Sequence, residues 1–493
     1  MELLRKLIGR PCRVHFIGIG GAGMFPLAEI LYSRGFAVTG SDSGESETLE
    51  RVRALGIPVA MPQSAENIGG AELIVFTAAL LADNPELSAA RESGIPTYER
   101  AKLLGVLTEG RTCRDGRTCR DGSGYGNTIG VSGTHGKTTV TAMIAHILLK
   151  CGKNPSAVIG GKLPLTGTNG IDGGREIMVV ESCEFADTFL QISPTTAVIL
   201  NIDADHMEYF KTMEKLRASF TRFAAAAQTV IYNADDENTR LAVANLDGKH
   251  MVPVGTGADC FARAENITLE RQLPRFTLIA DGAAYSVKLN TPGVHNVHNA
   301  LAALAACKLA GVDWEDAVAA AASFGGAGRR FEIMARVTPA GRRSSPSANG
   351  EIGGAEHSDC ITIADDYAHH PKELEATLRA AMGMGYRKVW AIFQPFTFSR
   401  TAMLLDDFAR ALQIADYAVL TEIKGSREVN TYGIHTADLA AKIPDSVWFP
   451  TFEEIADYVA ERIQPDDLVI TLGCGDPYKV GRLITELIKA PRA

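Results

Sequence analysis

No stretch of the sequence approaches the roughly 18 uninterrupted apolar residues of a transmembrane helix, so we expect none. The first residues, MELLRKLIGRPCRVHF, lack the apolar core and cleavage site of a signal peptide. Basic residues are not in excess, since 49 Lys and Arg stand against 58 Asp and Glu for a net charge of −9. We therefore expect a cytoplasmic protein with neither a membrane nor a nucleic acid as its partner, either a monomer or a homodimer.

Paired cysteines are also lacking. The nine cysteines are scattered and contain no Cys-x-x-Cys pair, so neither a disulfide framework nor a structural zinc site is expected. With 46% hydrophobic and 22% charged residues, the composition is that of an ordinary globular protein. A length of 493 residues suggests about three domains.

Short β-branched runs alternate with Ala- and Leu-rich periodic segments, which predicts an α/β fold. A helix is expected through residues 28–32. Strands are expected at residues 13–17, 37–40, 73–76, 128–131, 177–180, 197–202, 388–393, 417–421 and 468–472, and near 331–337 and 360–364.

Two segments interrupt this alternation. Residues 111–122 read RTCRDGRTCRDG, a six-residue unit repeated once, and we interpret them as a solvated linker without catalytic meaning. Residues 340–358 are rich in Gly, Ser and Ala and are interpreted as a long loop between two strands. The predicted domains are therefore residues 1–125, 126–328 and 329–493.

A glycine-rich loop follows the first expected strand. Gly18, Gly20, Gly21 and Gly23 fit the pattern G-x-G-x-x-G between a strand and a helix, and Asp42 ends the next strand. Such a loop brings backbone N–H groups up to a pyrophosphate, and the acid can accept a hydrogen bond from a ribose hydroxyl. The pattern fits NAD, FAD or a UDP-sugar, and a tight structural turn is the alternative.

A second loop gives a more specific signal. The sequence SGTHGKTT at 132–139 follows the strand expected at 128–131 and precedes an apolar helix. Gly-Lys-Thr at such a turn is typical of a triphosphate cradle, in which Lys137 neutralises phosphate charge and Thr138 ligates Mg²⁺. The strict pattern has glycine six residues before the lysine, where this chain has Val131, so the loop is a variant. The predicted ATP-binding residues of the loop are Gly133, Thr134, His135, Gly136, Lys137, Thr138 and Thr139.

Two further side chains can complete a metal site. Glu181 follows the strand expected at 177–180, and His206 follows the one expected at 197–202. Either alone fits an ordinary polar strand end. Their place on the two strands after the lysine loop favours a role as metal ligands with Thr138.

At this point the chain resembles the Mur ligases of peptidoglycan synthesis. The resemblance runs in consistent order from about residue 13 to 485. It rests on these motifs: HFIGIGGAGM at 15–24, GTHGKTT at 133–139, ESCEFADTF at 181–189, NIDADHMEYF at 201–210, HNVHNA at 295–300, RRFE at 329–332, DDYAHHP at 365–371 and SREVNTYGI at 426–434.

The resemblance implies three domains: a Rossmann-like domain for a UDP-sugar, a central P-loop ATPase domain and a Rossmann-like C-terminal domain. It implies ATP and Mg²⁺ as cofactors, with Lys137, Glu181, His206 and Arg330 in catalysis. The first loop points to the branch that adds L-alanine to UDP-N-acetylmuramate through an acyl phosphate. A ligase that reattaches a recycled murein tripeptide is the alternative within the family, and a nicotinamide-dependent dehydrogenase is a remote one outside it.

By the same resemblance, further residues have expected roles. Those beside the nucleotide are His295, Asn296, Asn299, Arg330 and Asp366. Arg427 and Asn430 are expected to meet the amino acid, and His370 is a candidate general base, with a structural role as its alternative and with His369 next to it. Other members of the family carry a carbamoylated lysine about fifteen residues after the metal histidine. This chain has Thr221 there, so we predict no such modification.

Overall fold

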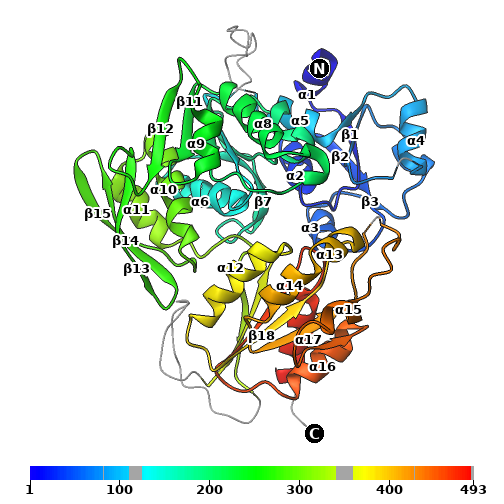
Figure 1. Ribbon diagram of the computed structural model, residues 1–493. Coiled ribbons are helices and arrows are strands. Elements are labelled where there is room, and N and C mark those ends of the chain that lie inside the picture. The colour runs from blue at the N-terminus through cyan, green and yellow to red at the C-terminus, as the bar shows by residue number, and fades with distance from the viewer. Residues whose placement is uncertain (82, 110–124, 340–358, 427, 490–493) are drawn as a thin grey trace. The chain divides into compact units, whose positions relative to one another are not determined.

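The structure is a computed structural model that describes residues 1–81, 83–109, 125–339, 359–426 and 428–489. The fold is α/β, as predicted, with three sheets flanked by helices (Figure 1). The segments 111–122 and 340–358 lie outside the described residues, so the interpretations given to them stay predictions.

The first sheet has five parallel strands in the order β3-β2-β1-β4-β5. This is the Rossmann strand order 3-2-1-4-5-6 without its sixth strand. Its strands are β1 (Arg13–Ile17), β2 (Ala37–Ser41), β3 (Val59–Ala60), β4 (Leu73–Phe76) and β5 (Thr97–Glu99), and its helices are α1 (Glu2–Ile8), α2 (Phe25–Ser33), α3 (Glu47–Ala54), η1 (Ala65–Ile68), α4 (Pro85–Glu92) and α5 (Arg100–Leu107).

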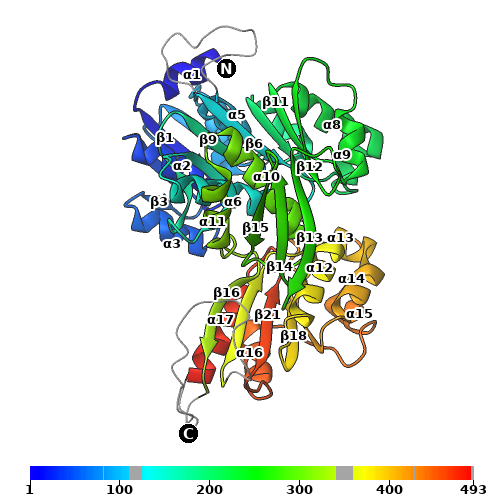
Figure 2. The ribbon, with the colours of Figure 1, turned by 90° about the vertical axis from the view of Figure 1, so that its left-hand side faces the viewer.

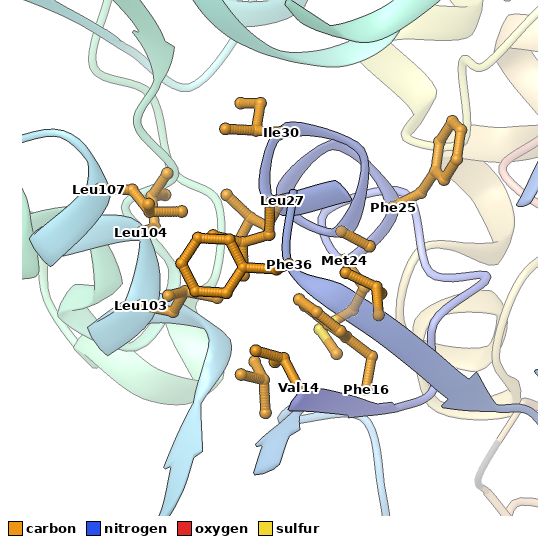
Figure 3. Close-up of a cluster of buried hydrophobic side chains, with 14 of the residues drawn as sticks. Val14, Phe16, Met24, Phe25, Leu27, Ile30, Phe36, Leu103, Leu104 and Leu107 are labelled. Carbon is orange, nitrogen blue, oxygen red and sulfur yellow. The ribbon is translucent and has the colours of Figure 1, made fainter. Parts of the chain in front are cut away.

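Alternation along β1 separates two apolar clusters on the two faces of this sheet. Val14 and Phe16 pack with Leu27 of α2 and Leu103 of α5 in the larger cluster, which Figure 3 shows. Ile17 belongs to the smaller cluster on the other face. β1 is therefore buried on both faces from Val14 to Ile17, and its one buried polar residue, His15, is hydrogen-bonded to Glu86 and Thr39.

The second sheet has ten strands in the order β15-β14-β13-β12-β11-β10-β6-β9-β7-β8. They are β6 (Asn127–Ser132), β7 (Ser156–Leu163), β8 (Thr168–Ile171), β9 (Ile177–Glu181), β10 (Thr196–Ile199), β11 (Thr229–Asn233), β12 (His250–Gly255), β13 (Ala262–Glu270), β14 (Leu273–Ala280) and β15 (Ala283–Lys288). The helices are α6 (Lys137–Lys150), η2 (Phe185–Gln191), α7 (Met207–Phe210), α8 (Met213–Ala225), α9 (Glu237–Val243), α10 (His295–Leu309) and α11 (Trp314–Ala322).

Strand β6 lies between β9 and β10 and is parallel to both. Val131 pairs with Glu181 on one side, and Ser132 pairs with Ile199 on the other. The carboxyl ends of these three strands therefore meet at one edge of the sheet, where α/β folds place their ligands.

The third sheet has the order β16-β17-β21-β18-β19-β20, with β16 as an antiparallel edge strand and the other pairs parallel. Its strands are β16 (Glu332–Val337), β17 (Ile361–Asp366), β18 (Lys388–Phe393), β19 (Tyr417–Thr421), β20 (Val447–Phe449) and β21 (Asp467–Leu472). Its helices are α12 (Pro371–Met382), α13 (Phe398–Met403), α14 (Leu405–Leu412), α15 (Thr436–Ala440), α16 (Phe452–Ala460) and α17 (Tyr478–Lys489).

Helices cover both faces of this third sheet. Alternate residues of β18 divide between the two sides, with Ala391 and Phe393 in one apolar cluster and Trp390 and Ile392 in the other. Figure 2 shows α16 and α17 on one face and α12, α14 and α15 on the opposite face. The layering is Rossmann-like, although the strand order differs from that of the first sheet.

The chain divides into two compact units. Unit 1 comprises Met1–Ile267, Phe276–Val287 and Val297–Ala327, and unit 2 comprises Thr268–Arg275, Lys288–Asn296 and Gly328–Ala493. Unit 1 thus holds the first sheet and most of the second. The boundaries placed near residues 125 and 328 stay predictions. Within the part of the chain that the structure describes, no helix has the length and apolar character needed to cross a bilayer.

Each strand expected from the sequence is present, with ends shifted by up to three residues. The largest correction concerns the strand expected at 197–202, because β10 ends at Ile199. Asn201 has left the sheet, and its carbonyl oxygen accepts a hydrogen bond from the N–H of Thr134. The missed strands are β3, β5, β7, β8, β11, β12, β13, β14, β15 and β20.

Candidate functional site

The lysine loop joins β6 to α6 and depends on two glycines. Gly133 has φ +149° and Gly136 has φ +85°, values that side chains disfavour. A Cβ at Gly136 would lie 2.6 Å from Oδ1 of Asn299, and one at Gly133 would lie 2.9 Å from Cβ of Leu200. Substitution at either glycine would therefore displace the loop or its neighbours.

Asn201 clamps this loop from the end of β10. Its Oδ1 accepts from the N–H of His135 at 2.8 Å, and its Nδ2 donates to the carbonyl of His135 at 3.1 Å. Asp203 adds a further tie, since its N–H donates to Oγ1 of Thr134 at 2.9 Å. The loop is thus held in shape by residues of the motif at 201–210.

Lys137 is the first residue of α6, and its ammonium folds back over the loop. Nζ donates to the carbonyl oxygens of Gly133 at 2.5 Å and Thr134 at 3.0 Å, and to Oε1 of Glu184 at 3.1 Å. Burial alone would lower the pKa of Lys137, but the charge and hydrogen bond of Glu184, together with the neighbouring Cys183 and Glu181, raise this pKa above its ordinary value. The loop therefore carries a permanent cation at neutral pH.

Thr138 and Glu181 bring two oxygen donors together beside Lys137. Oγ1 of Thr138 donates to Oε1 of Glu181 at 3.0 Å, and Oε2 of Glu181 accepts from the N–H of Gly160 at 2.7 Å. A hydroxyl and a carboxylate are the hard donors that Mg²⁺ prefers. The N–H groups in the first turn of α6, including that of Thr139, lack partners within the helix and can meet an anion.

His206 lies just before α7 with a positive φ of 54°. Its ring centroid is 4.7 Å from that of Phe185, and its Nε2 is 3.8 Å from Oδ2 of Asp205. Among the described residues, no three His, Cys, Asp or Glu side chains form a group that could hold a metal. The structure therefore joins Thr138 to Glu181, and the metal role of His206 stays a prediction.

Helix α10 carries the three residues expected beside the nucleotide. Asn299 is 6% exposed and lies against Gly136 of the loop. Asn296 precedes it by about one turn and donates from Nδ2 to the carbonyl of Pro292 at 2.7 Å. His295 begins the helix. The structure places Asn299 at the lysine loop, and the nucleotide contacts of all three stay predictions.

The first glycine loop joins β1 to α2 and has a tight form. Gly18 has φ +84°, and a Cβ there would lie 2.6 Å from Cγ2 of Thr77. Oδ2 of Asp42 accepts from the N–H of Gly20 at 2.9 Å, and its Oδ1 accepts from the N–H of Ser43 at 2.8 Å. Asp42 thus shapes the loop itself, and its expected ribose contact stays a prediction.

In unit 2, two adjacent arginines have different surroundings. Arg329 donates to Oδ2 of Asp365 at 2.8 Å and to the carbonyls of Gly473 and Gly475 at 2.7 and 2.9 Å. Arg330 lies with its Cζ 5.0 Å from the ring centroid of Tyr367. Arg329 therefore ties the unit together. Among the described residues, Arg330 contacts the ring of Tyr367 and attracts Asp366 but makes no hydrogen bond.

Asp366 ends β17 in a buried position beside these arginines. Its two carboxylate oxygens accept from the N–H groups of Phe331 at 2.8 Å and Ala368 at 2.7 Å. Burial raises the pKa of Asp366 to about 6, against the opposing effect of Arg330. A ribose contact of Asp366 stays a prediction.

The histidine pair after β17 belongs to a helix cap. Nδ1 of His370 accepts from the N–H of Lys372 at 3.4 Å, and Oε2 of Glu373 accepts from the N–H of His370 at 3.2 Å. In a neutral ring this leaves the proton on Nε2. Nδ1 of His369 lies 3.0 Å from the carbonyl of Tyr367, and burial lowers its pKa. The geometry favours a structural role for His370, and its role as general base stays a prediction.

Two more predicted positions can be placed and one cannot. Asn430 closes its own loop, donating to the carbonyl of Ile434 at 2.9 Å and accepting from the N–H of Ile434 at 3.3 Å. Arg427 lies outside the described residues. The hydroxyl of Thr221 donates to the carbonyls of Arg217 and Ala242, which joins α8 to α9. Thr221 thus has a packing role.

Sequence reasoning missed two residues of this site, Asn201 and Glu184. Both are polar and lie close after the ends of strands that flank β6, which is the signal that singled out Glu181 and His206. Their action on the loop depends on side-chain direction, which spacing alone does not give.

Comparison with known proteins agrees with this architecture. The chain matches the Mur ligase family catalytic domain over residues 13–112, the Mur ligase middle domain over 131–307 and the Mur ligase glutamate ligase domain over 352–475. A relative from Acetivibrio thermocellus, named UDP-N-acetylmuramate–L-alanine ligase, is 39% identical over 95% of this chain and 95% of its own length. A protein of the same name from Lachnospira eligens is also 39% identical, over 96% of this chain and 97% of its own.

Solved structures give the same result. The UDP-N-acetylmuramate–alanine ligase of Thermotoga maritima matches with a TM-score of 0.76 and 28% identity, covering 96% of this chain and 98% of that one. A murein peptide ligase from Psychrobacter arcticus matches with a TM-score of 0.71 at 22% identity, covering 98% and 100%, and shows the fold alone. The lysine loop, the strand order around it and these full-length matches lead to one conclusion: the chain belongs to the Mur ligase family.

Proposed function

We propose that this chain is an ATP-dependent ligase that joins L-alanine to the lactyl carboxylate of UDP-N-acetylmuramate in peptidoglycan precursor synthesis. The observation that carries the proposal is the Lys137 loop. It lies in a chain that is 39% identical, over nearly its whole length, to proteins named UDP-N-acetylmuramate–L-alanine ligase. The work of such an enzyme is to make a carboxylate reactive toward an amine.

The proposed reaction has two steps. An oxygen of the lactyl carboxylate attacks the γ-phosphorus of ATP and forms an acyl phosphate. The bond between the γ-phosphorus and the bridging oxygen breaks, and ADP leaves with that oxygen. The amine of L-alanine then attacks the acyl carbon, loses a proton, and the tetrahedral intermediate expels inorganic phosphate. The phosphate therefore carries one oxygen that began in the carboxylate.

Lys137 supplies the fixed positive charge for the first step. Two anions must approach each other there, and a cation at the transferring phosphate lowers that repulsion. In the structure Nζ of Lys137 donates to two loop carbonyls and to Glu184. A small rotation of the Lys137 side chain would let Nζ donate to phosphate oxygens in place of the carbonyls. Asn201 keeps the loop N–H groups in place for the same anion.

The donor set of Thr138 and Glu181 fits Mg²⁺. The ion is usually held by one or two protein oxygens and by substrate phosphates, so this pair is sufficient. Bound there, Mg²⁺ would neutralise charge on the transferring phosphate. We expect His206 to serve a second ion, by family resemblance.

The remaining roles also come from the family resemblance. The loop of Gly18 to Gly23 takes the UDP-sugar, Arg330 and Asp366 take phosphate and ribose, and Asn430 with Arg427 takes the amino acid. Closure of the C-terminal domain on the substrates would exclude water from the acyl phosphate. Because ATP and a nucleotide sugar are its substrates, we place the enzyme in the cytoplasm, as a monomer or homodimer.

The test is phosphate release by the purified chain with ATP, Mg²⁺ and UDP-N-acetylmuramate, offered L-alanine, glycine, L-serine or a murein tripeptide in turn. We expect release to depend on all components and to be fastest with L-alanine. Because one methyl group is worth about 1–3 kcal/mol, glycine should react roughly 10- to 100-fold less efficiently. Preference for the tripeptide would favour the recycling ligase instead.

A further inference from the structure

The carboxylate of Glu181 is held from two sides. Thr138 of α6 donates to Oε1, and the N–H of Gly160 in β7 donates to Oε2 at 2.7 Å. A Cβ at Gly160 would lie 2.5 Å from each of the two carboxylate oxygens. The absence of a side chain therefore lets the backbone of β7 come close enough to donate to this carboxylate.

Strand β7 changes partner where Gly160 lies. Its first residues pair in parallel with β9, which ends at Glu181, and Val158 is the last residue of that ladder. On its other side β7 pairs with β8, and the register of this pairing breaks between Val158 and Leu163. Gly160 lies within the break, so its N–H is directed to a side chain instead of a neighbouring strand, as at β-bulges beside functional sites.

Strand β8 is fixed to helix α2, which flanks the first sheet. Oε2 of Glu29 in α2 accepts from the hydroxyl of Thr168 and from the N–H of Gly170 at 3.1 Å. A Cβ at Gly170 would lie 2.6 Å from the carbonyl oxygen of Pro26, so the helix packs directly on the backbone of this strand. Helix and strand both belong to unit 1.

The two contacts lie close together on the hairpin that β7 and β8 form. Gly170, which is bound to Glu29, pairs with Val158, and Val158 precedes Gly160 by two residues. A displacement of β8 on α2 would therefore also move the N–H group that donates to Glu181. The hairpin thus connects helix α2 to the carboxylate beside the lysine loop.

The direction of this carboxylate matters because the donors that fit Mg²⁺ are one hydroxyl and one carboxylate. With Oε2 of Glu181 bound to Gly160, Oε1 is the oxygen beside the hydroxyl of Thr138. Groups that hydrogen-bond to a ligating side chain fix its orientation, and loss of such a group typically weakens metal binding about 10- to 100-fold.

We propose that Gly160 is a positioning residue for Mg²⁺, and that Glu29 of α2 keeps Gly160 in place through β8. The inference rests on the proposed function for the identity of the ion, and on the hydrogen bonds and close contacts of the hairpin for the positioning. The helix that follows the first glycine loop thereby supports the metal site of the second.

The test measures the Mg²⁺ gain, which we define as the ratio of the ATP affinity with Mg²⁺ to the ATP affinity with EDTA, both by calorimetry. Gly160→Ala should lower this gain about 10- to 100-fold and leave the affinity in EDTA unchanged, because the added Cβ displaces the carboxylate of Glu181. Glu29→Met should lower the gain by a smaller factor, because two donors of β8 lose their acceptor. Glu29→Gln keeps a side-chain oxygen as acceptor and should retain most of the wild-type gain.

The matched control is Gly325→Ala, at an exposed glycine where an added Cβ has open space around it. This variant should have the wild-type Mg²⁺ gain. An ATP affinity in EDTA near that of wild type shows that each variant is folded at the lysine loop. An unchanged Mg²⁺ gain in Gly160→Ala or in Glu29→Met, or equal losses of affinity with Mg²⁺ and with EDTA, would overturn the proposal.

Glu181→Gln separates a failure of this proposal from a failure of the proposed function. If wild type has a Mg²⁺ gain that Glu181→Gln loses, the ion is bound where we propose, and Gly160→Ala and Glu29→Met decide the positioning role. A wild type without a Mg²⁺ gain, or a full gain in Glu181→Gln, would contradict the proposed Mg²⁺ site and the positioning role with it.

Discussion

The ammonium of Lys137 lies 3.1 Å from Oε1 and 3.0 Å from Oε2 of Glu184, a carboxylate that is 1% exposed. The cation of the triphosphate loop thus has a buried counter-ion within the protein. This pairing keeps Lys137 protonated in a site whose burial opposes the charge. Because Glu184 also competes with phosphate for the ammonium of Lys137, it affects both the protonation of Lys137 and the affinity of the loop for phosphate.

Replacing Glu184 by Gln should shift the alkaline limb of the pH–rate profile. Without this carboxylate, burial is opposed only by Cys183 and Glu181, so the pKa of Lys137 falls and the amine loses its proton at a lower pH. We expect kcat/KM for ATP to fall at a lower pH than in wild type when measured from about pH 7 to about pH 10. Glu184→Asp should restore much of the wild-type profile, and superimposable profiles for all three proteins would contradict this role.

Lys137→Met should separate chemistry from sugar binding. Loss of one fixed charge at the transferring phosphate should reduce kcat by about 10²–10³-fold or more. The affinity for UDP-N-acetylmuramate, measured by calorimetry, should stay near that of wild type because the first glycine loop is a separate site. A collapse of sugar affinity would show that the two loops do not act independently.

Substitution of Arg330 should reduce activity, whereas substitution of Arg329 should reduce stability. Arg330→Met should lower kcat by about 10²–10³-fold with little change in melting temperature, since its guanidinium lies over Tyr367. Arg329→Met leaves Asp365 buried without its partner and should cost about 3–5 kcal/mol of unfolding free energy. Chemical denaturation and steady-state rates, measured on both variants, test these two roles. A large kcat loss in Arg329→Met and a large stability loss in Arg330→Met would assign the phosphate contact to Arg329.

Asp366 should make stability fall with rising pH. Its folded-state pKa of about 6 exceeds the model-peptide value near 3.9, so the native state binds more protons between these values. The stability that this group contributes is full below about pH 4 and is lost as pH rises through 6, by roughly 3 kcal/mol at most.

Asp366→Asn tests this claim. The variant should flatten the fall in unfolding free energy measured by denaturant titration between about pH 4 and about pH 6. The exposed Asp457→Asn on α16 is the matched control and should keep the wild-type slope. An unchanged slope in Asp366→Asn would show that other groups carry the pH dependence.

Strands buried on both faces could be predicted from the sequence because they are continuous apolar runs. β4 is such a run throughout, and β18 and β19 are apolar except for Lys388 at the start of one and Thr421 at the end of the other. Strands β13, β14 and β15 were missed because half-buried or exposed polar residues interrupt them, so no continuous apolar run marks them. β3, β5 and β20 are only two or three residues long, too short for a periodic signal.

The glycine loops could be predicted because positive φ and close approach require glycine, as at Gly18 and Gly136. The pairing of Thr138 with Glu181 followed from parallel strands sharing one edge. The contacts of Asn201 with the loop and of Glu184 with Lys137 could not, because they depend on side-chain rotamers. The capping geometry of His370 likewise depends on the direction of its ring.

The central claim is that Lys137 and its loop let ATP phosphorylate the lactyl carboxylate, and oxygen transfer tests it most directly. UDP-N-acetylmuramate labelled with ¹⁸O in that carboxylate is turned over with ATP, Mg²⁺ and L-alanine, and the inorganic phosphate is analysed by mass spectrometry. The account predicts one carboxylate oxygen in each phosphate released by wild type, and negligible release by Lys137→Met. Unlabelled phosphate from an enzyme that still forms the amide would contradict it.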